Sequence, residues 1–218
     1  SNYPLFSLLG EVSAKRYRRI AFVYGASEFL QLDAVHFRNS VGSGRIVIEQ
    51  ELHSLADYRS IAARVLAEKP EATTFLVNVE DGLKYLRALK ELNAFRRMEL
   101  ICDVNTTYYM EQYLAVLGSE IFEGCLATVL PNDRKADFVK RFRKRFGHEP
   151  APFADYAYDA ASLIRRLASA PKERWLLDTQ HIVWRGVSGV IKFDQSGTRL
   201  GKAEIQVFRG GKFVKVKK

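Results

Sequence analysis

The chain has 218 residues, 47% of them hydrophobic, which is enough for a substantial core and argues against a disordered protein. Its 34 basic residues outnumber its 25 acidic ones, giving a net charge of +9 that favours association with nucleic acid, anionic lipid or an acidic partner. No apolar run approaches the roughly 20 residues that a membrane-spanning helix needs, and no segment has the features of a signal peptide. The length predicts one large domain or slightly more.

Short apolar strands alternate with amphipathic helices between residues 19 and 130. Strands are expected at residues 19–24, 46–52, 73–79, 99–104 and 124–130, with helices at 27–40, 54–68, 81–93 and 108–117. Strands joined by helices of this length pair in parallel, because a parallel pair needs a crossover connection. Strands that are apolar on both faces indicate a sheet covered on both sides. The pattern predicts an α/β fold with a doubly wound, mostly parallel five-stranded sheet of flavodoxin-like strand order.

The last third of the chain has a different pattern. Helices are expected at residues 133–146, 153–168 and 173–178. A strand is expected at 190–193, followed by a hairpin of strands 203–208 and 212–216 around Gly210-Gly211. This tail therefore adds C-terminal helices and a β-hairpin to the α/β unit.

The segments that resemble catalytic motifs do not stand in the structural context that those motifs require. The glycines of residues 42–44 precede a strand, whereas a nucleotide-binding glycine run must follow a strand and open a helix. Residues 186–189 are one residue short of a nucleophile elbow. The four histidines are scattered, with no ligand spacing for a metal. We therefore expect no enzyme activity, no metal and no cofactor.

The helix at 133–146 is strongly basic, but its apolar residues define a packing face. Phe138, Val139, Phe142 and Phe146 lie on one side, so the basic side chains occupy the solvated side. No nucleic-acid-binding motif accompanies them. The sequence therefore predicts no nucleic-acid partner.

The two cysteines, Cys102 and Cys125, have two interpretations. They are too far apart for a CxxC motif, and free cysteines are often buried as thiols. They form a disulfide instead if the strands that carry them are neighbours and the protein is exported.

Five segments, in order, resemble the branched-chain amino-acid (Leu/Ile/Val) binding family of ABC importers, which has the type I periplasmic solute-binding fold. They lie at residues 57–72, 138–150 (FVKRFRKRFGHEP), 158–160 (YDA), 186–197 (GVSGVIKFDQSG) and 208–216 (FRGGKFVKV). The resemblance covers about residues 18–216 and implies two α/β lobes joined by a hinge, with a ligand held between them.

This resemblance assigns parts of the chain to lobes. Residues 19–148 plus 183–218 correspond to the second lobe, 149–182 resemble a remnant of the first lobe, and 1–18 form an N-terminal lead-in. The first lobe is otherwise largely absent.

The resemblance also implies a function. The chain would be the extracytoplasmic or periplasmic solute-binding component, or a fragment of one, of an ABC-type importer. It would bind an amino acid or similar small molecule by lobe closure, without catalysis, and deliver it to a membrane permease. The alternative is a degenerate binding-protein-like domain used for protein–protein interaction or sensing in the cell envelope.

Ligands of doubly wound sheets bind beyond the carboxyl ends of the strands. The candidate ligand-binding residues at these ends are Tyr24, Ser27, Phe29, Asn78, Val79, Asp103, Asn105 and Thr106. Two positions depart from the family: Phe29-Leu30 replaces its Tyr-Gly pair, and Val79-Glu80 replaces an aromatic residue or glycine. Asp103 can hold a ligand ammonium group or cap a helix, and Thr106 has the same two interpretations.

The helix at 153–167 is apolar on several sides, through residues such as Tyr156, Leu163 and Ile164. In the family, the first-lobe sheet would cover part of this surface. Exposed apolar patches usually mark interfaces, so we expect a homodimer formed through this helix.

Overall fold

The computed structural model describes residues 3–53, 55–129, 135–169, 171–195, 197–201 and 203–216. The chain divides into two compact units. The larger contains Asn2–Val129 and Glu204–Lys218, and the smaller contains Leu130–Ala203. Within the described ranges, no helix is long and apolar enough to span a membrane.

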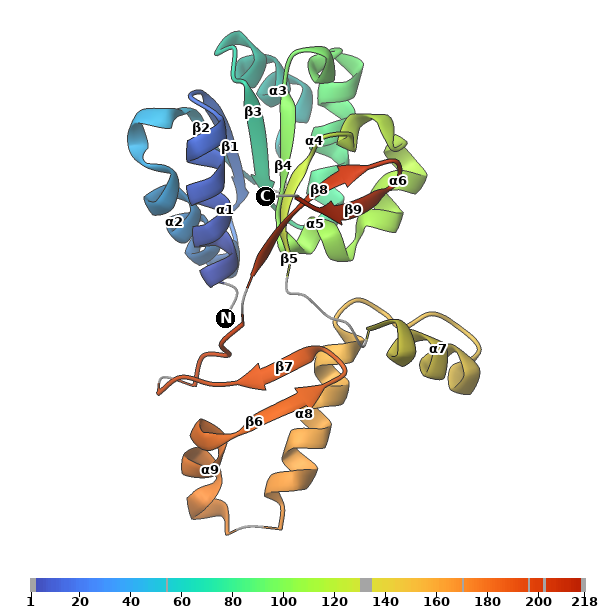
Figure 1. Ribbon diagram of the computed structural model, residues 1–218. Coiled ribbons are helices and arrows are strands. Elements are labelled where there is room, and N and C mark those ends of the chain that lie inside the picture. The colour runs from blue at the N-terminus through green and yellow to red at the C-terminus, as the bar shows by residue number, and fades with distance from the viewer. Residues whose placement is uncertain are drawn as a thin grey trace. The chain divides into compact units, whose positions relative to one another are not determined.

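The larger unit is built on one twisted sheet with strand order β2-β1-β3-β4-β5-β8-β9 (Figure 1). The first five strands pair in parallel: β1 (Ile20–Gly25), β2 (Ile46–Leu52), β3 (Ala72–Leu76), β4 (Glu99–Cys102) and β5 (Leu126–Val129). The predicted parallel sheet and its flavodoxin-like order are therefore confirmed. The predicted hairpin, β8 (Glu204–Arg209) and β9 (Lys212–Lys215), joins the same sheet antiparallel to β5 and extends it to seven strands.

Helices cover both faces of this sheet. On one face lie α1 (Tyr3–Arg16) and α2 (Glu28–Val41), and the ring of Phe37 in α2 packs 5.0 Å from that of Phe22 in β1. The other face packs against α3 (Tyr58–Ala67), α4 (Val79–Glu91) and α6 (Met110–Leu117) in one continuous core. Short helices fill the connections: η1 (Ser43–Arg45), η2 (Ala94–Arg96), α5 (Val104–Tyr108) and η3 (Glu120–Phe122).

The lead-in expected at residues 1–18 contains a helix that the sequence analysis missed. Leu5, Phe6 and Leu9 of α1 are fully buried, so this segment is part of the core. Gly10 is an unfavourable residue inside a helix, but a Cβ there would lie 2.8 Å from the carbonyl oxygen of Phe37. The glycine therefore allows α1 and α2 to pack closely.

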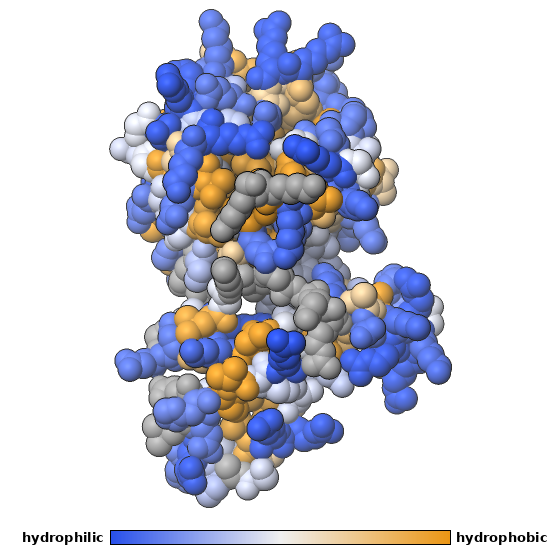
Figure 2. Space-filling model, viewed as in Figure 1, coloured by the Kyte–Doolittle hydropathy of each residue, from blue (hydrophilic) through white to orange (hydrophobic). Residues whose placement is uncertain are grey.

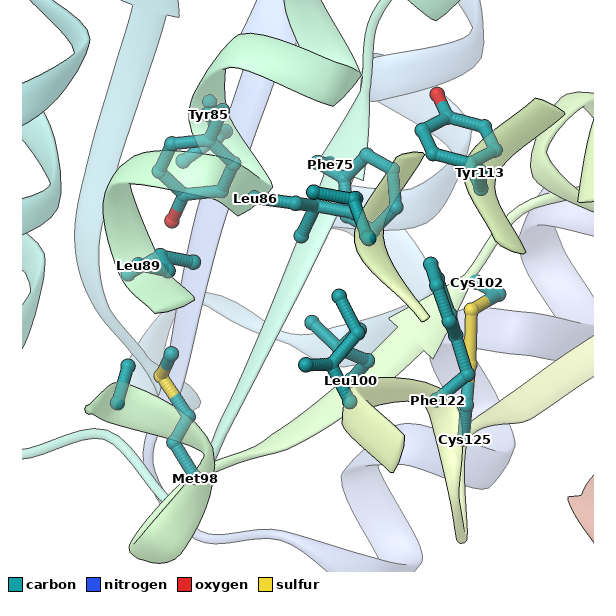
Figure 3. Packing of buried hydrophobic residues seen from close by; sticks show 14 of the residues in the cluster. Phe75, Tyr85, Leu86, Leu89, Met98, Leu100, Cys102, Tyr113, Phe122 and Cys125 are labelled. Atoms are coloured by element: carbon teal, nitrogen blue, oxygen red, sulfur yellow. A yellow bond between two sulfur atoms is a disulfide. The ribbon is translucent and has the colours of Figure 1, made fainter. Parts of the chain in front are cut away.

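Cys102 and Cys125 form a disulfide, which resolves the two interpretations of these residues. Cys102 ends β4 and Cys125 immediately precedes β5, and the two strands are paired neighbours. Their Cα atoms are 6.3 Å apart, and both side chains are fully buried beside Phe122 (Figure 3). Such a bond is typical of proteins in oxidising compartments.

The smaller unit contains α7 (Lys135–Phe146), α8 (Ala154–Leu167), η4 (Lys172–Arg174), α9 (Trp175–His181) and an antiparallel pair, β6 (Val183–Gly186) and β7 (Gly189–Lys192). Asp159 of α8 holds the β6–β7 turn: its carboxylate accepts hydrogen bonds from the Val187 and Ser188 amides at 2.8 and 2.7 Å. In this division residues 135–148 and 183–203 group with α8 and α9, and the assignment of residues to two lobes stays a prediction.

Candidate functional site

The candidate site lies at the carboxyl edge of the parallel sheet, where β1, β3 and β4 are neighbours. Each of these strands is followed, within two residues, by the N-cap residue of the next helix. Ser27, Asn78 and Asp103 are the N-caps of α2, α4 and α5. Because the strands are parallel, these three caps lie along one edge of the sheet.

The cluster after β4 is buried and internally satisfied. One oxygen of Asp103, Oδ1, accepts hydrogen bonds from the Thr106 amide at 2.7 Å and the Thr106 hydroxyl at 2.6 Å. Its other oxygen, Oδ2, accepts one from the Asn105 side-chain amide at 3.1 Å. Burial raises the pKa of Asp103, although these hydrogen bonds act in the opposite direction. Three of the predicted site residues therefore come together, in a helix cap.

The cluster after β3 contains two residues that the sequence analysis missed. Asn78 caps the Asp81 amide at 2.9 Å and donates to the Asp81 carboxylate at 2.7 Å. Tyr58, the first residue of α3, donates a hydrogen bond from its hydroxyl to the same carboxylate. Burial and the neighbouring Asp81 raise the pKa of Tyr58 to about 12. The Asn-x-x-Asp spacing resembles a capping box and could have indicated the pair, but the role of Tyr58 depends on the packing of α3 beside α4.

Tyr113 of α6 lies between these two clusters. It is fully buried, and its pKa is raised by burial and by the charges of Asp103 and Asp81. A Cβ on Gly82, one residue after Asp81, would lie 2.3 Å from the Tyr113 hydroxyl. Figure 3 shows Tyr113 at the end of the core cluster beyond Phe75.

A further carboxyl group, Asp33, was missed and lies on the opposite face of the sheet, in α2. It is 1% exposed, and within the described ranges neither of its oxygens has a hydrogen-bond partner. Burial and the charge of Asp103 raise its pKa to about 7. The only sequence signal was its spacing, since Leu30, Asp33 and Phe37 fall on one face of the helix.

The other predicted residues do not join these clusters. The ring of Tyr24 contacts Phe22 and the guanidinium group of Arg38. Phe29 is 58% exposed on α2. Val79 packs against the core shared by α3, α4 and α6.

The edge therefore offers carboxylates, amides and hydroxyls, which suit the binding of polar or cationic groups. Among the described residues, no group of three or more His, Cys, Asp or Glu side chains could hold a metal ion. Tyr113, which is buried, and Tyr58, which is partly buried, have raised pKa values, remain protonated at neutral pH and can act as hydrogen-bond partners.

Comparison with known proteins places this geometry in context. Residues 3–180 match the family described as periplasmic binding protein. A leucine binding protein from Thermotoga maritima has 16% identity and a TM-score of 0.77, and the match covers 99% of this chain and 65% of that one.

Two further solved structures are similar. A substrate-binding protein of an ABC transporter from Desulfitobacterium hafniense, in complex with Leu, has 20% identity and a TM-score of 0.72, and the match covers 99% and 65% of the two chains. A solute binding protein from Rhodopseudomonas palustris, in complex with p-hydroxybenzoic acid, has 14% identity, a TM-score of 0.82 and coverage of 99% and 63%.

At these identities the structures share the fold, and this chain spans about two thirds of their length. No curated protein matched the chain.

Proposed function

The chain belongs to the periplasmic binding protein family, and on that premise we propose that it is the solute-binding component, or part of one, of an ABC-type importer. Its ligand is an amino acid or a similar small molecule, bound without catalysis and passed to a membrane permease. The place of action is the periplasm or another extracytoplasmic compartment, in keeping with the buried disulfide.

One observation carries this proposal: polar N-cap residues that follow successive parallel strands lie along the carboxyl edge of the sheet. Asn78 with Asp81 and Asp103 with Thr106 line this edge, as expected for ligand sites of doubly wound sheets. The carboxyl groups of Asp81 and Asp103 suit a ligand with an ammonium group, as in an amino acid. We propose that Tyr24, Ser27, Phe29, Val79 and Asn105 flank the same site.

Calorimetric titration of the chain with the common L-amino acids and with p-hydroxybenzoate tests the proposal. We expect heat of binding with at least one amino acid, and about a tenfold or greater weakening in Asp103→Asn, which keeps the capping oxygen but removes the charge. The matched control is Asp57→Asn, the same change at the N-cap of α3. Circular dichroism establishes that both variants are folded. Binding that is equally strong in Asp103→Asn would refute the assigned role of this residue.

The second candidate function is a binding-protein-like domain used for protein–protein interaction or sensing. It is favoured by the hydrogen bonds of Asp103, both of whose oxygens are occupied by groups of the chain itself. The absence of heat with every amino acid and with p-hydroxybenzoate would support this function over transport.

A further inference from the structure

A concave site lies at the other edge of the sheet, where β3 and β4 begin. It is a groove of about 470 Å³ between the end of α3 and the segment that leads from α4 through η2 to β4. Figure 2 shows hydrophilic side chains projecting from this end of the larger unit. Because parallel strands separate the two edges, the groove is remote from the candidate site described above.

Three cations line the groove, and the fold does not neutralise them. Lys69, Arg96 and Arg97 are exposed, and none of them forms an ion pair with a carboxylate of the described ranges. Nearby Arg16, in contrast, is paired with Glu99 at 2.6 Å. The three side chains are therefore available to an external anion.

The structural roles that basic residues often have at such a place are already filled. Helix C-termini attract cations, but the carbonyl oxygens of Glu68 and Lys69 at the end of α3 accept hydrogen bonds from Arg19. Glu71, the single carboxylate among the lining residues, accepts hydrogen bonds from the Arg18 and Arg19 amides at 2.6 and 3.3 Å. Capping of the helix and pairing with Glu71 thus do not account for Lys69, Arg96 and Arg97.

The floor of the groove is apolar. Leu66 and Leu92 are partly buried against the core, and Met98 is almost fully buried at its margin (Figure 3). A small inorganic ion would leave the exposed parts of Leu66 and Leu92 facing water. A ligand with an acidic head and an apolar chain would cover them and gain hydrophobic free energy.

We propose that this groove binds an amphiphilic organic anion. The phosphate, sulfate or carboxylate head lies on Lys69, Arg96 and Arg97, where the two guanidinium groups can each donate paired hydrogen bonds. The alkyl or aromatic portion lies on Leu66 and Leu92, which are only partly buried. The volume suits a molecule of ordinary ligand size. This site is independent of the proposed solute-binding function, because it shares no residue with the carboxyl edge.

Nuclear magnetic resonance titration of the full chain with octyl phosphate, below its micelle concentration, tests the proposal. We expect saturable shifts of the amides of residues 66–71 and 92–98, and binding at least about tenfold weaker in the double variant Arg96→Ala, Arg97→Ala. The matched control, Arg141→Ala with Arg145→Ala, removes the same charge from the exposed side of α7 and leaves the shifts unchanged.

Two probes separate the contributions of head and chain. Inorganic phosphate should bind much more weakly than octyl phosphate, and octanol should not shift the same amides. The proposal is overturned if the amides of the groove do not respond, if the Arg96/Arg97 variant binds as tightly as the unmodified chain, or if inorganic phosphate binds as tightly as octyl phosphate. Conserved amide dispersion in both double variants establishes that they are folded.

Discussion

Replacing Asp33 by asparagine isolates the effect of one buried carboxyl group on the stability of the larger unit. The side chain is 1% exposed, and its two oxygens have no hydrogen-bond partner among the residues that the structure describes. Asparagine has nearly the same shape but carries no charge at any pH. The substitution therefore removes an ionisation while leaving the packing of α2 on the sheet almost unchanged.

The magnitude follows from the pKa. The pKa of Asp33 is raised from 3.8 to about 7 in the folded chain, by burial and then by Asp103. Because the folded state holds its proton more tightly than the unfolded state, raising the pH from about 4 to 7 removes stability, and the loss is complete above pH 7. At about 1.4 kcal/mol for each pKa unit, the upper limit is about 4 kcal/mol.

The assay is urea denaturation followed by circular dichroism at pH values between 4 and 8.5. Asp33→Asn should be more stable than the unmodified chain by about 2–4 kcal/mol at pH 8, and the difference should shrink to within about 1 kcal/mol at pH 4. Asp57→Asn is the control: the pKa of Asp57 is lowered by hydrogen bonds from Ser60, so its contribution is lost only in more acidic solution. Parallel stability curves for Asp33→Asn and the unmodified chain would refute the reasoning.

Three further predictions concern packing and association. Gly82→Ala should lower the unfolding free energy by about 1–3 kcal/mol, because the added Cβ would clash with the hydroxyl of buried Tyr113. This loss is expected even though alanine has the better helix propensity. In a Tyr113→Phe background, urea denaturation should show a smaller loss of unfolding free energy. Asp159→Ala should cost about 3 kcal/mol by leaving the buried Ser188 donors without an acceptor, and hydrogen exchange should report early opening of β6 and β7. The chain should form dimers through α8, where Ile164 is 57% exposed; light scattering should show a dimer that Ile164→Glu dissociates, and a clean monomer at high concentration would contradict this.

For several predicted site residues, the sequence pattern could not distinguish a ligand contact from a residue that caps a helix. Asp103 and Thr106 were open to interpretation as ligand contacts or as cap residues, and the structure shows that Asp103 caps α5 and that Thr106, inside α5, donates hydrogen bonds to it. Their role toward a ligand stays a prediction. The sequence analysis missed Asp81 and Tyr58 because their hydrogen bond joins two different helices, α3 and α4. The two residues are 23 positions apart in the sequence, so no local pattern connects them.

The amino-acid sequence by itself determined the parallel strands, their crossover helices and the C-terminal hairpin. Periodicity, β-branched content and the glycine pair at 210–211 are local signals, and they lie within one element or one turn. The ordered motifs that resemble a solute-binding family are also visible in the sequence alone, and the family match over residues 3–180 agrees with them.

Only the tertiary structure decided which distant residues meet. Pairing of β4 with β5 brings Cys102 to Cys125, and close packing of α1 on α2 makes the N-terminal segment a core helix. Packing of the larger unit also buries Asp33, whose oxygens have no hydrogen-bond partner in the part of the chain that the structure describes. In each case the contact free energy comes from segments far apart in the chain, so no local propensity could reveal it.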